Sequence, residues 1–246
     1  MSRGAVLKAN TGAPLREGTP VRRAAALTRA ALALAQETAH RRSVFINCPF
    51  GGAYSQWLDA IIFTIICCGF EPRSALETDN VADSRMKRII DALSGSHLSI
   101  HDLSLVYGET GSGIAHLNMP LELGLAVAMK EAHEKGEAKR AHDWTALVLD
   151  GSAYVRAISD LNGYDLKRYS TRATLVAQVM SWLVTRMRGM RVPFTPTEVI
   201  AALTDYDTEL TTLRTDWQGL PPWSHIVDRG RVVAGRHSLQ ALSLAP

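Results

Sequence analysis

The chain has 246 residues, of which 46% are hydrophobic and 21% charged, a composition typical of a globular protein with a sizeable core. The most apolar stretch, Ala60 to Cys68, is far too short to span a bilayer, so we expect a soluble protein with no membrane partner. The three cysteines, Cys48, Cys67 and Cys68, leave one unpaired in any disulfide scheme. This excludes a disulfide scaffold and favours a reducing, cytoplasmic location.

The net charge of +3 is unevenly placed. Residues 1–42 contain eight basic and two acidic side chains, hence +6, and the remainder of the chain sums to −3. Such a basic arm could contact nucleic acid or an acidic partner, and its Arg- and Ala-rich start also resembles a transit peptide. The body of the chain offers no basic stripe with interleaved aromatic residues. We therefore favour a solvated arm over a nucleic-acid interface.

Within the arm, Thr19 and Pro20 are typical of a helix start, and the Ala/Leu-rich run 24–35 predicts a helix to about Thr38. From Ser43 the pattern alternates between strands and helices. The predicted strands are 44–48, 70–76, 97–102 and 145–150, with a weaker fifth candidate near 164–168. The predicted helices are 54–68, closed by Gly69, then 84–93 capped by Asp83 or Ser84, 120–134 and 171–188.

This alternation predicts an α/β fold, a doubly wound parallel sheet of four to five strands in the flavodoxin-like order 2-1-3-4-5. Pro72 suits the strand 70–76 to a sheet edge. We divide the chain into the arm 1–42, an α/β domain 43–190, and a helical C-terminal extension 191–246.

The extension begins with a capping box, Thr195-Pro196-Thr197-Glu198. The helix that follows carries an apolar stripe at helical spacing, made by Val199, Leu203, Tyr206, Leu210, Leu213 and Trp217. This stripe requires a partner surface, either on the same chain or on a second copy, and we expect self-association through it as a homo-oligomer. The run 226–233 predicts a β-hairpin in the last segment.

In a sheet of this order, a crevice opens where strands 1 and 3 diverge, beyond their carboxyl ends. The turn from Asn47 to Gly52 lies at one of these ends and Asp102 at the other. Gly51 permits close backbone approach by a ligand, and Phe50 or Tyr54 could stack on a planar ring. The alternative for this segment is an ordinary strand-to-helix turn.

Glu122 heads the next helix. Pro120 is pre-set for a first helical turn, so Glu122 falls where unpaired backbone N–H groups favour an ionised carboxylate. Facing a crevice, it could be a nucleophile or cation stabiliser; on an exposed helix start, it is a stabilising N-terminal residue. Asp102 ends an apolar strand, where a carboxylate needs hydrogen bonds or a site, or else caps the next turn. Two carboxylates in one crevice would repel, which would raise one pKa.

Other motifs are weaker. The Gly-rich run 108–113 lacks the Gly-Lys-Ser/Thr of a phosphate loop and is interpreted as a mobile lid or spacer. Cys48 is interpreted as a small buried hydrophobe, because no base partner is evident. His97 and His101 share one face of a strand without the cysteine or carboxylate pattern of a zinc site, so we expect no metal and no cofactor.

Three segments resemble the nucleoside 2-deoxyribosyltransferase-like superfamily, a structural relative of the TIR domains that cleave NAD. They are Val44-Phe45-Ile46-Asn47-Cys48-Pro49-Phe50, Ile100-His101-Asp102 and Met119-Pro120-Leu121-Glu122-Leu123-Gly124-Leu125-Ala126, within residues 43–188. The resemblance implies that Glu122 acts at the anomeric carbon, that Asp102 contacts the sugar hydroxyls or assists proton transfer, and that Phe50 and Tyr54 line the base pocket. Asn47, Pro49, Gly51, Asn118 and Met119 complete the implied substrate-binding set.

The resemblance therefore implies an N-glycosidase that cleaves the ribose–base bond of a nucleotide or of NAD through Glu122 and Asp102. One alternative is a nucleoside 2-deoxyribosyltransferase, although Asn118-Met119-Pro120 departs from the Gly-Thr pair that commonly precedes the transferase glutamate. Another is a non-catalytic nucleotide-sensing or scaffolding domain whose two extensions bind partners.

Overall fold

The computed structural model describes residues 20–50, 52–77, 84–104, 118–150, 163–186, 192 and 194–243. The chain forms two compact units, Met1–Thr38 and Ala39–Pro246. The described part of the first unit belongs to helix α1 (Pro20–Arg42), which confirms the helix predicted in the arm and extends it by four residues. Thr19 and the Gly-rich run 108–113 lie outside the described residues. The second unit contains the sheet and all the sites discussed below.

The sheet has five parallel strands in the order β2-β1-β3-β4-β5, which confirms the predicted fold class. Its strands are β1 (Ser43–Asn47), β2 (Glu71–Arg73), β3 (Leu98–Asp102), β4 (Asp143–Leu149) and β5 (Lys167–Tyr169). The short strand β2, with Pro72 at its centre, forms one edge as expected. Asn47 pairs in register with His101, so the carboxyl ends of β1 and β3 lie side by side.

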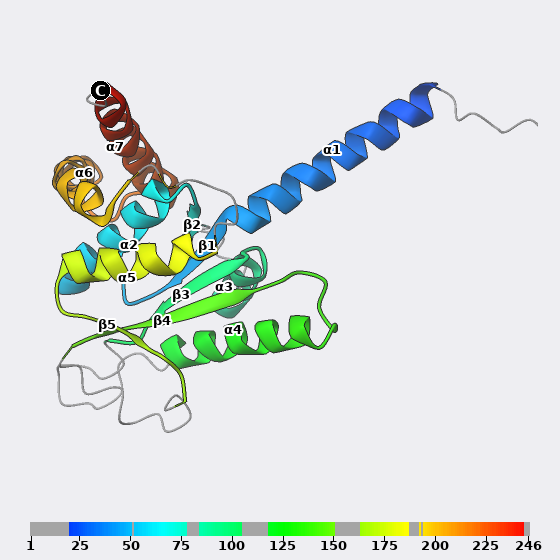
Figure 1. The fold of residues 1–246 in the computed structure, drawn as a ribbon, viewed down its shortest axis with the longest axis horizontal. Helices are drawn as coiled ribbons and strands as arrows, with labels where there is room; N and C mark the ends of the chain where they lie inside the picture. Colours follow the sequence, from blue (N-terminus) through cyan, green and yellow to red (C-terminus); the bar gives the residue numbers. More distant parts are fainter. Residues whose placement is uncertain are drawn as a thin grey trace, which may run out of the picture. The chain divides into compact units, whose positions relative to one another are not determined.

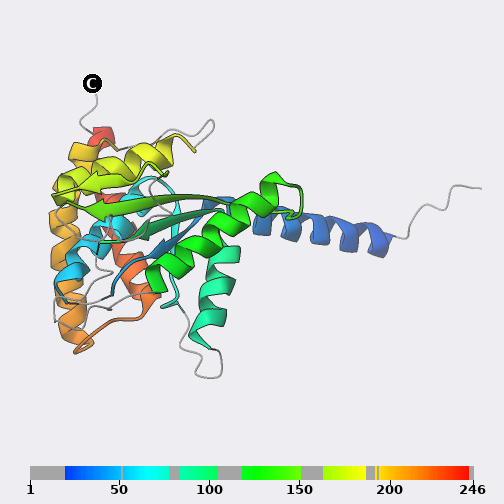
Figure 2. The same ribbon diagram turned by 90° about the horizontal axis from the view of Figure 1, so that it is seen from below.

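Helices cover both faces of this sheet. Figures 1 and 2 show α2 (Ser55–Cys67) and α5 (Arg172–Val184) on one face, with α3 (Arg85–Ser94) and α4 (Asn118–Glu134) on the other. Strand β1 serves both layers because its side chains alternate: Val44 and Ile46 pack with α2, whereas Phe45 packs with α3 and α4. Of the two caps predicted for α3, Asp83 lies outside the described residues, and Ser84 is the cap: its hydroxyl accepts a hydrogen bond from the Lys87 backbone N–H at 3.1 Å.

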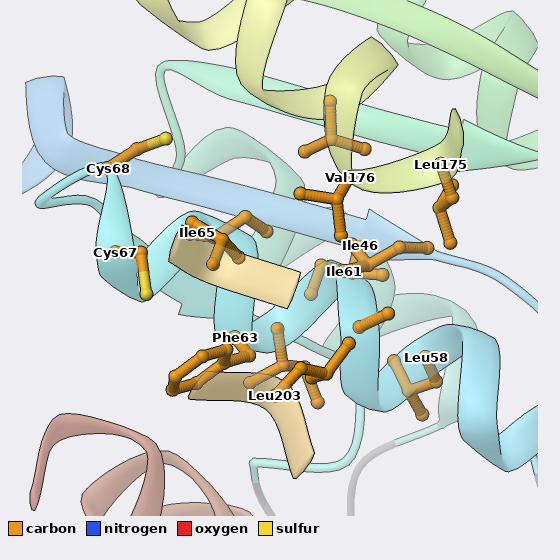
Figure 3. Packing of buried hydrophobic residues seen from close by; sticks show 14 of the residues in the cluster. Ile46, Leu58, Ile61, Phe63, Ile65, Cys67, Cys68, Leu175, Val176 and Leu203 are labelled. Atoms are coloured by element: carbon orange, nitrogen blue, oxygen red, sulfur yellow. The ribbon is translucent and has the colours of Figure 1, made fainter. Parts of the chain in front are cut away.

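Helix α2 is the most deeply buried helix of the fold, and nine of its 13 residues are buried. Figure 3 shows Ile61, Phe63 and Ile65 of α2 packed among side chains of β1, α5 and α6 (Pro196–Asp216). The helix ends at Cys67, and the predicted Gly69 follows its cap residue with φ +78°, a conformation that glycine reaches without steric strain. The Gly69 and Phe70 backbone N–H groups donate to carbonyls of the last turn, at 2.9 Å and 3.0 Å.

The C-terminal segment differs from its prediction. Residues 226–233 form no hairpin but lie within helix α7 (Trp223–Ser243). Ile226, Val227, Val233 and Ala234 are buried at helical spacing on one face. This face packs against α2 and α6, which is why the helical period prevails over the two short β-branched runs. At its centre, a Cβ on Gly230 would lie 2.5 Å from Ile66 Cδ1 and 3.4 Å from the Tyr206 ring.

The apolar stripe of α6 is covered within the chain. Val199, Leu203, Tyr206, Leu210 and Leu213 are each at most 5% exposed, and the Tyr206 ring stacks on Phe63 of α2 at 4.8 Å between centroids. The buried Asp59 of α2 accepts two hydrogen bonds from Arg214 of α6, at 2.8 Å and 3.0 Å. Because α2 and α7 occupy the stripe, the predicted self-association cannot use it. Trp217 is the exception and remains 48% exposed.

Within the part of the chain that the structure describes, no helix has both the length and the apolar character needed to cross a membrane.

The tight approach at Gly230 gives a testable prediction. Gly230→Leu should destabilise the protein by about 1–3 kcal/mol, because the added side chain must displace Ile66 and Tyr206. Gly235→Leu is the matched control on the same helix, since its Cβ would meet open space and leucine favours helix over glycine. Urea denaturation measures both variants. Equal stabilities for the two would contradict the packing of α7 described above.

Candidate functional site

The candidate site lies at the carboxyl edge of the sheet, where β1 and β3 diverge. Strand β1 ends at Asn47, strand β3 ends at Asp102, and α4 begins at Asn118. Doubly wound sheets bind ligands at this position, because the connections from the two strands leave on opposite faces. The structure thus brings the predicted Asn47, Asp102 and the first turns of α4 to one edge.

Asn47 fixes the start of α4 to the sheet. Its side chain is buried, and Nδ2 donates to the Met119 carbonyl at 3.0 Å and lies 3.0 Å from His101 Nδ1. Its Oδ1 is buried and has no hydrogen-bond donor within the described structure. A buried acceptor without a donor is costly, and such groups occur preferentially at functional sites. Asn47 Oδ1 is therefore a buried acceptor at this edge whose hydrogen bond is not made.

A buried hydrogen-bond chain continues from Asn47 across the sheet. His101 Nε2 lies 2.9 Å from Ser99 Oγ, Ser99 Oγ lies 2.9 Å from His142 Nε2, and His142 Nδ1 lies 3.0 Å from the Ser96 carbonyl. Burial lowers the pKa of His101 to about 3 and that of His142 to about 4, so both rings are neutral. Since the Ser96 carbonyl only accepts, every proton in the chain is assigned, with each donor pointing from Asn47 toward Ser96.

Asp102 is fully buried, and both of its carboxyl oxygens have partners. Oδ1 accepts from the Ser104 backbone N–H at 2.9 Å, and Oδ2 accepts from the Tyr169 hydroxyl at 2.7 Å. Burial raises the pKa of Asp102, and the hydrogen bonds from Ser104 and Tyr169 offset part of that rise. These bonds match the alternative interpretation, in which the side chain caps the turn after its strand. They also tie β3 to β5, so Asp102 has a structural role without any ligand.

Glu122 lies deeper in its helix than predicted. Because α4 starts at Asn118, Glu122 is the fifth helical residue, and the first turn holds no acidic side chain. Burial raises the pKa of Glu122 to about 7, and the Asn118 amide at 3.3 Å and the charge of Arg85 only partly oppose it. The expectation of a readily ionised carboxylate was therefore wrong. Because Glu122 is only 3% exposed, the cost of desolvating its charge outweighs the stabilisation that the start of a helix gives to a carboxylate.

Cys48 shows that both carboxylates act on the same region. Burial raises the pKa of the Cys48 thiol well above its usual range, and the charges of Asp102 and Glu122 raise it further. The thiol therefore stays protonated, in agreement with its interpretation as a small buried hydrophobe. Desolvation, and not the expected mutual repulsion, is the main cause of the raised pKa of both carboxyl groups.

The other predicted residues have mixed positions. Phe50 is half-buried and lines a cavity of about 730 Å³, whereas Pro49 and Tyr54 are buried. Tyr54 is only 3% exposed, and burial raises the pKa of its hydroxyl. Met119 packs in the core beneath α4, and Gly51 lies outside the described residues. Of the two rings predicted to line a base pocket, Phe50 lines this cavity and Tyr54 does not.

Arg85 is a residue of this region that sequence reasoning missed. It is the first residue of α3, it is exposed, and its charge lowers the pKa of Glu122. A basic residue at a helix start opposes the helix dipole, and that unfavourable placement was the available signal.

The described residues contain no group of three or more His, Cys, Asp or Glu side chains suited to a metal ion. His101 instead bonds to Asn47 and Ser99, and His97 Nδ1 lies 2.9 Å from the Ala141 carbonyl. Comparison of the chain with family models, with curated proteins and with solved structures gave no match. The resemblance to the nucleoside 2-deoxyribosyltransferase-like superfamily therefore stays a prediction.

The raised pKa of Glu122 predicts a pH-dependent stability. The unfolded state loses the Glu122 proton near pH 4.5, whereas the folded state keeps it up to about pH 7. The free energy of unfolding should therefore fall between these two pH values and level off above them. The loss should be roughly 3 kcal/mol. Glu122→Gln should abolish this fall, whereas Glu131→Gln, an exposed change on the same helix, should keep it. Urea denaturation at pH 5 and pH 8 measures the difference; parallel profiles for parent and Glu122→Gln would refute the burial argument.

The hydrogen bonds of Asp102 give a second prediction for this edge. Tyr169→Phe removes the hydroxyl that donates to Asp102 Oδ2 and lies 3.3 Å from Ser104 Oγ. We expect a loss of roughly 1–3 kcal/mol in stability, because a buried carboxylate loses a donor. Tyr164→Phe, at a residue 43% exposed, should change stability by less than about 0.5 kcal/mol. A Tyr169→Phe protein as stable as its control would show that Asp102 does not need this bond.

Proposed function

We propose that the protein is an N-glycosidase that cleaves the ribose–base bond of a nucleotide or of NAD, with Glu122 acting at C1′. The observation that carries this proposal is a desolvated carboxyl group with a pKa of about 7 beside the carboxyl edge of β1 and β3. A titratable group with a perturbed pKa at the ligand-binding edge of a doubly wound sheet is a catalytic candidate on physical grounds.

The chemistry fits a single carboxylate. Breaking the C1′–N bond develops positive charge on the ribose, and a carboxylate in a low-dielectric site stabilises that charge strongly. Glu122 either stabilises the cation or forms a C1′–O bond as the base departs with the bonding electrons. Nicotinamide leaves NAD as a neutral base, whereas a purine or pyrimidine base takes up a proton from water. Water then attacks C1′, gives up a proton and releases the carboxylate, so that the sugar product is ribose 5′-phosphate from a nucleotide or ADP-ribose from NAD. With a pKa of about 7, roughly half of the Glu122 population is ionised at neutral pH.

The surrounding side chains take supporting roles in this proposal. The Asn118 amide and the charge of Arg85 favour the ionised form of Glu122. The unpartnered Asn47 Oδ1 supplies an acceptor for a ribose hydroxyl. Asp102 is assigned a positioning role, because its oxygens already accept from Ser104 and Tyr169. The hypothesis thus needs one catalytic carboxylate, in place of the pair expected from the sequence.

A second candidate function is a nucleotide-binding domain without catalysis. The observation that favours it is the burial of both carboxylates, with Asp102 fully buried and Glu122 3% exposed. A degenerate site would keep these groups for stability alone.

The test is incubation of the full-length protein with NAD, nucleoside 5′-monophosphates and deoxynucleosides, followed by chromatography of released base. We expect release to rise with pH through about 7 and then level off, because the ionised form of Glu122 is the active one. Glu122→Gln should reduce release at least about a hundredfold. Glu131→Gln should release base at the parental rate.

The remaining outcomes separate the alternatives. Exchange of a labelled base in the absence of net hydrolysis would indicate a deoxyribosyltransferase. Base release that is identical in Glu122→Gln would remove Glu122 from the mechanism. No release from any substrate, together with unchanged ligand binding by Glu122→Gln, would favour the non-catalytic domain.

A further inference from the structure

The Asn47 side chain connects three segments that meet at the carboxyl edge of the sheet. It ends strand β1, and its Nδ2 carries two hydrogens. One is donated to the Met119 carbonyl in the first turn of α4, and the other points to His101 Nδ1 of β3, each over 3.0 Å. Both donors of the amide are therefore used, and both bonds are buried.

The His101 ring fixes the direction of these bonds. Its Nε2 lies 2.9 Å from Ser99 Oγ, and the Ser99 hydroxyl donates to His142 Nε2. The single proton of the neutral His101 ring therefore resides on Nε2, which leaves Nδ1 as an acceptor for the Asn47 amide. A reversed amide would place Asn47 Oδ1 against the Met119 carbonyl, and two acceptors repel. Oδ1 is for this reason the atom left without a partner.

The unpartnered Oδ1 indicates that the amide is kept for what it holds. Asn47 is only 1% exposed, and a buried oxygen without a donor destabilises the folded state. Such atoms occur preferentially at functional sites. An apolar side chain of similar size would avoid this cost, but it would leave the start of α4 without its hydrogen bond to the end of β1.

The segment that Asn47 holds carries Glu122. Met119 and Leu123 are at most 2% exposed and pack beneath α4 against side chains of β4. The Asn118 amide, in the same turn as Met119, donates to Glu122 Oε1 at 3.3 Å. The first turns of α4 are therefore held on the sheet by apolar packing and by the Asn47 hydrogen bond, and Glu122 is 3% exposed.

We propose that Asn47 and His101 are positioning residues for Glu122. They anchor the start of α4 to the ends of β1 and β3, so that the Glu122 carboxyl stays buried at this edge of the sheet. Asn47 acts through its Nδ2, and His101 acts through Asn47, so this role requires no contact with the reacting atoms. The effect on base release rests on the proposed function, whereas the anchoring does not.

Burial outweighs the other influences on the Glu122 carboxyl. The titratable and charged groups of this edge are Arg85 from α3, Cys48 after β1, and His101 and Asp102 from β3. The His101 ring and the Cys48 thiol are uncharged. The charge of Arg85 lowers the pKa of Glu122, yet desolvation raises it to about 7. The depth at which α4 holds Glu122 is therefore the main control on this pKa.

NMR titration of the Glu122 carboxyl carbon in the full-length protein tests the anchoring without requiring activity. Loss of the signal in Glu122→Gln assigns it. Asn47→Ala removes both donors and should lower the Glu122 pKa from about 7 to about 6 or below, because the helix start loosens and water reaches the carboxyl. Ser99→Ala removes the acceptor that keeps the His101 proton on Nε2, and it should lower the Glu122 pKa by a smaller amount.

Thr64→Val is the matched structural control. It removes an equally buried hydrogen bond, from Thr64 Oγ1 to the Ala60 carbonyl at 2.7 Å, but within α2 on the other face of the sheet. It should leave the Glu122 pKa at about 7. A Glu122 pKa that is unchanged in Asn47→Ala and Ser99→Ala, or that falls equally in Thr64→Val, would overturn the proposal. If Asn47→Ala does not fold, the Ser99→Ala protein decides the question in the same way.

Base release separates the anchoring from the proposed glycosidase. Ser99→Ala leaves Asn47 in place, so in an active protein it should move the rise of kcat with pH to lower pH, together with the Glu122 pKa. Asn47→Ala should in addition lower kcat at least about tenfold. A lowered Glu122 pKa in these variants of a protein that releases no base would support the anchoring and count against the glycosidase. Base release with the parental pH profile in both variants would count against the anchoring alone.

Discussion

The burial of α2 is the constraint on which the rest of the structure depends. This helix is apolar on almost every side, and Gln56 is its one exposed residue. A helix of this kind cannot pack one face on a sheet and leave its other face in water, so other elements must cover that second face. The sheet and α5 cover one side, and α6 and α7 cover the rest. The C-terminal helices thus complete the core, and their enclosure of α2 brings Trp217 and Trp223 to the cavity that Phe50 lines.

Most of the fold could be predicted from the sequence because its elements follow simple periodicities. The continuous apolar run of β1, the cap at Ser84, the glycine at Gly69 and the capping box at Thr195 are local signals, and each has the expected structure. Helix α7 was missed for a tertiary reason. Its apolar residues occur as two pairs around Gly230, and only the close approach to Ile66 and Tyr206 reveals why a glycine lies between them.

The site was less predictable, because its chemistry depends on burial and on contacts between distant segments. The placement of Asn47 and Asp102 at adjacent strand ends followed from topology alone. The partners of Asp102, above all Tyr169, lie far along the chain and could not be inferred. The ionisation of Glu122 was misjudged because the sequence indicated a helix terminus but gave no measure of desolvation. Arg85 could not be connected with Glu122 until the fold brought α3 against α4.

The hydrogen bond from Trp223 to strand β2 has a consequence for how copies of this protein meet. Proline at the middle of β2 removes one backbone donor from the outer rim of the sheet, and the Trp223 indole N–H occupies the Pro72 carbonyl at 3.2 Å. An incoming strand would find neither the donor nor the acceptor it needs at this point. The edge strand β2 is thus protected against β-augmentation and fibril-like stacking by the side chain of Trp223 in α7.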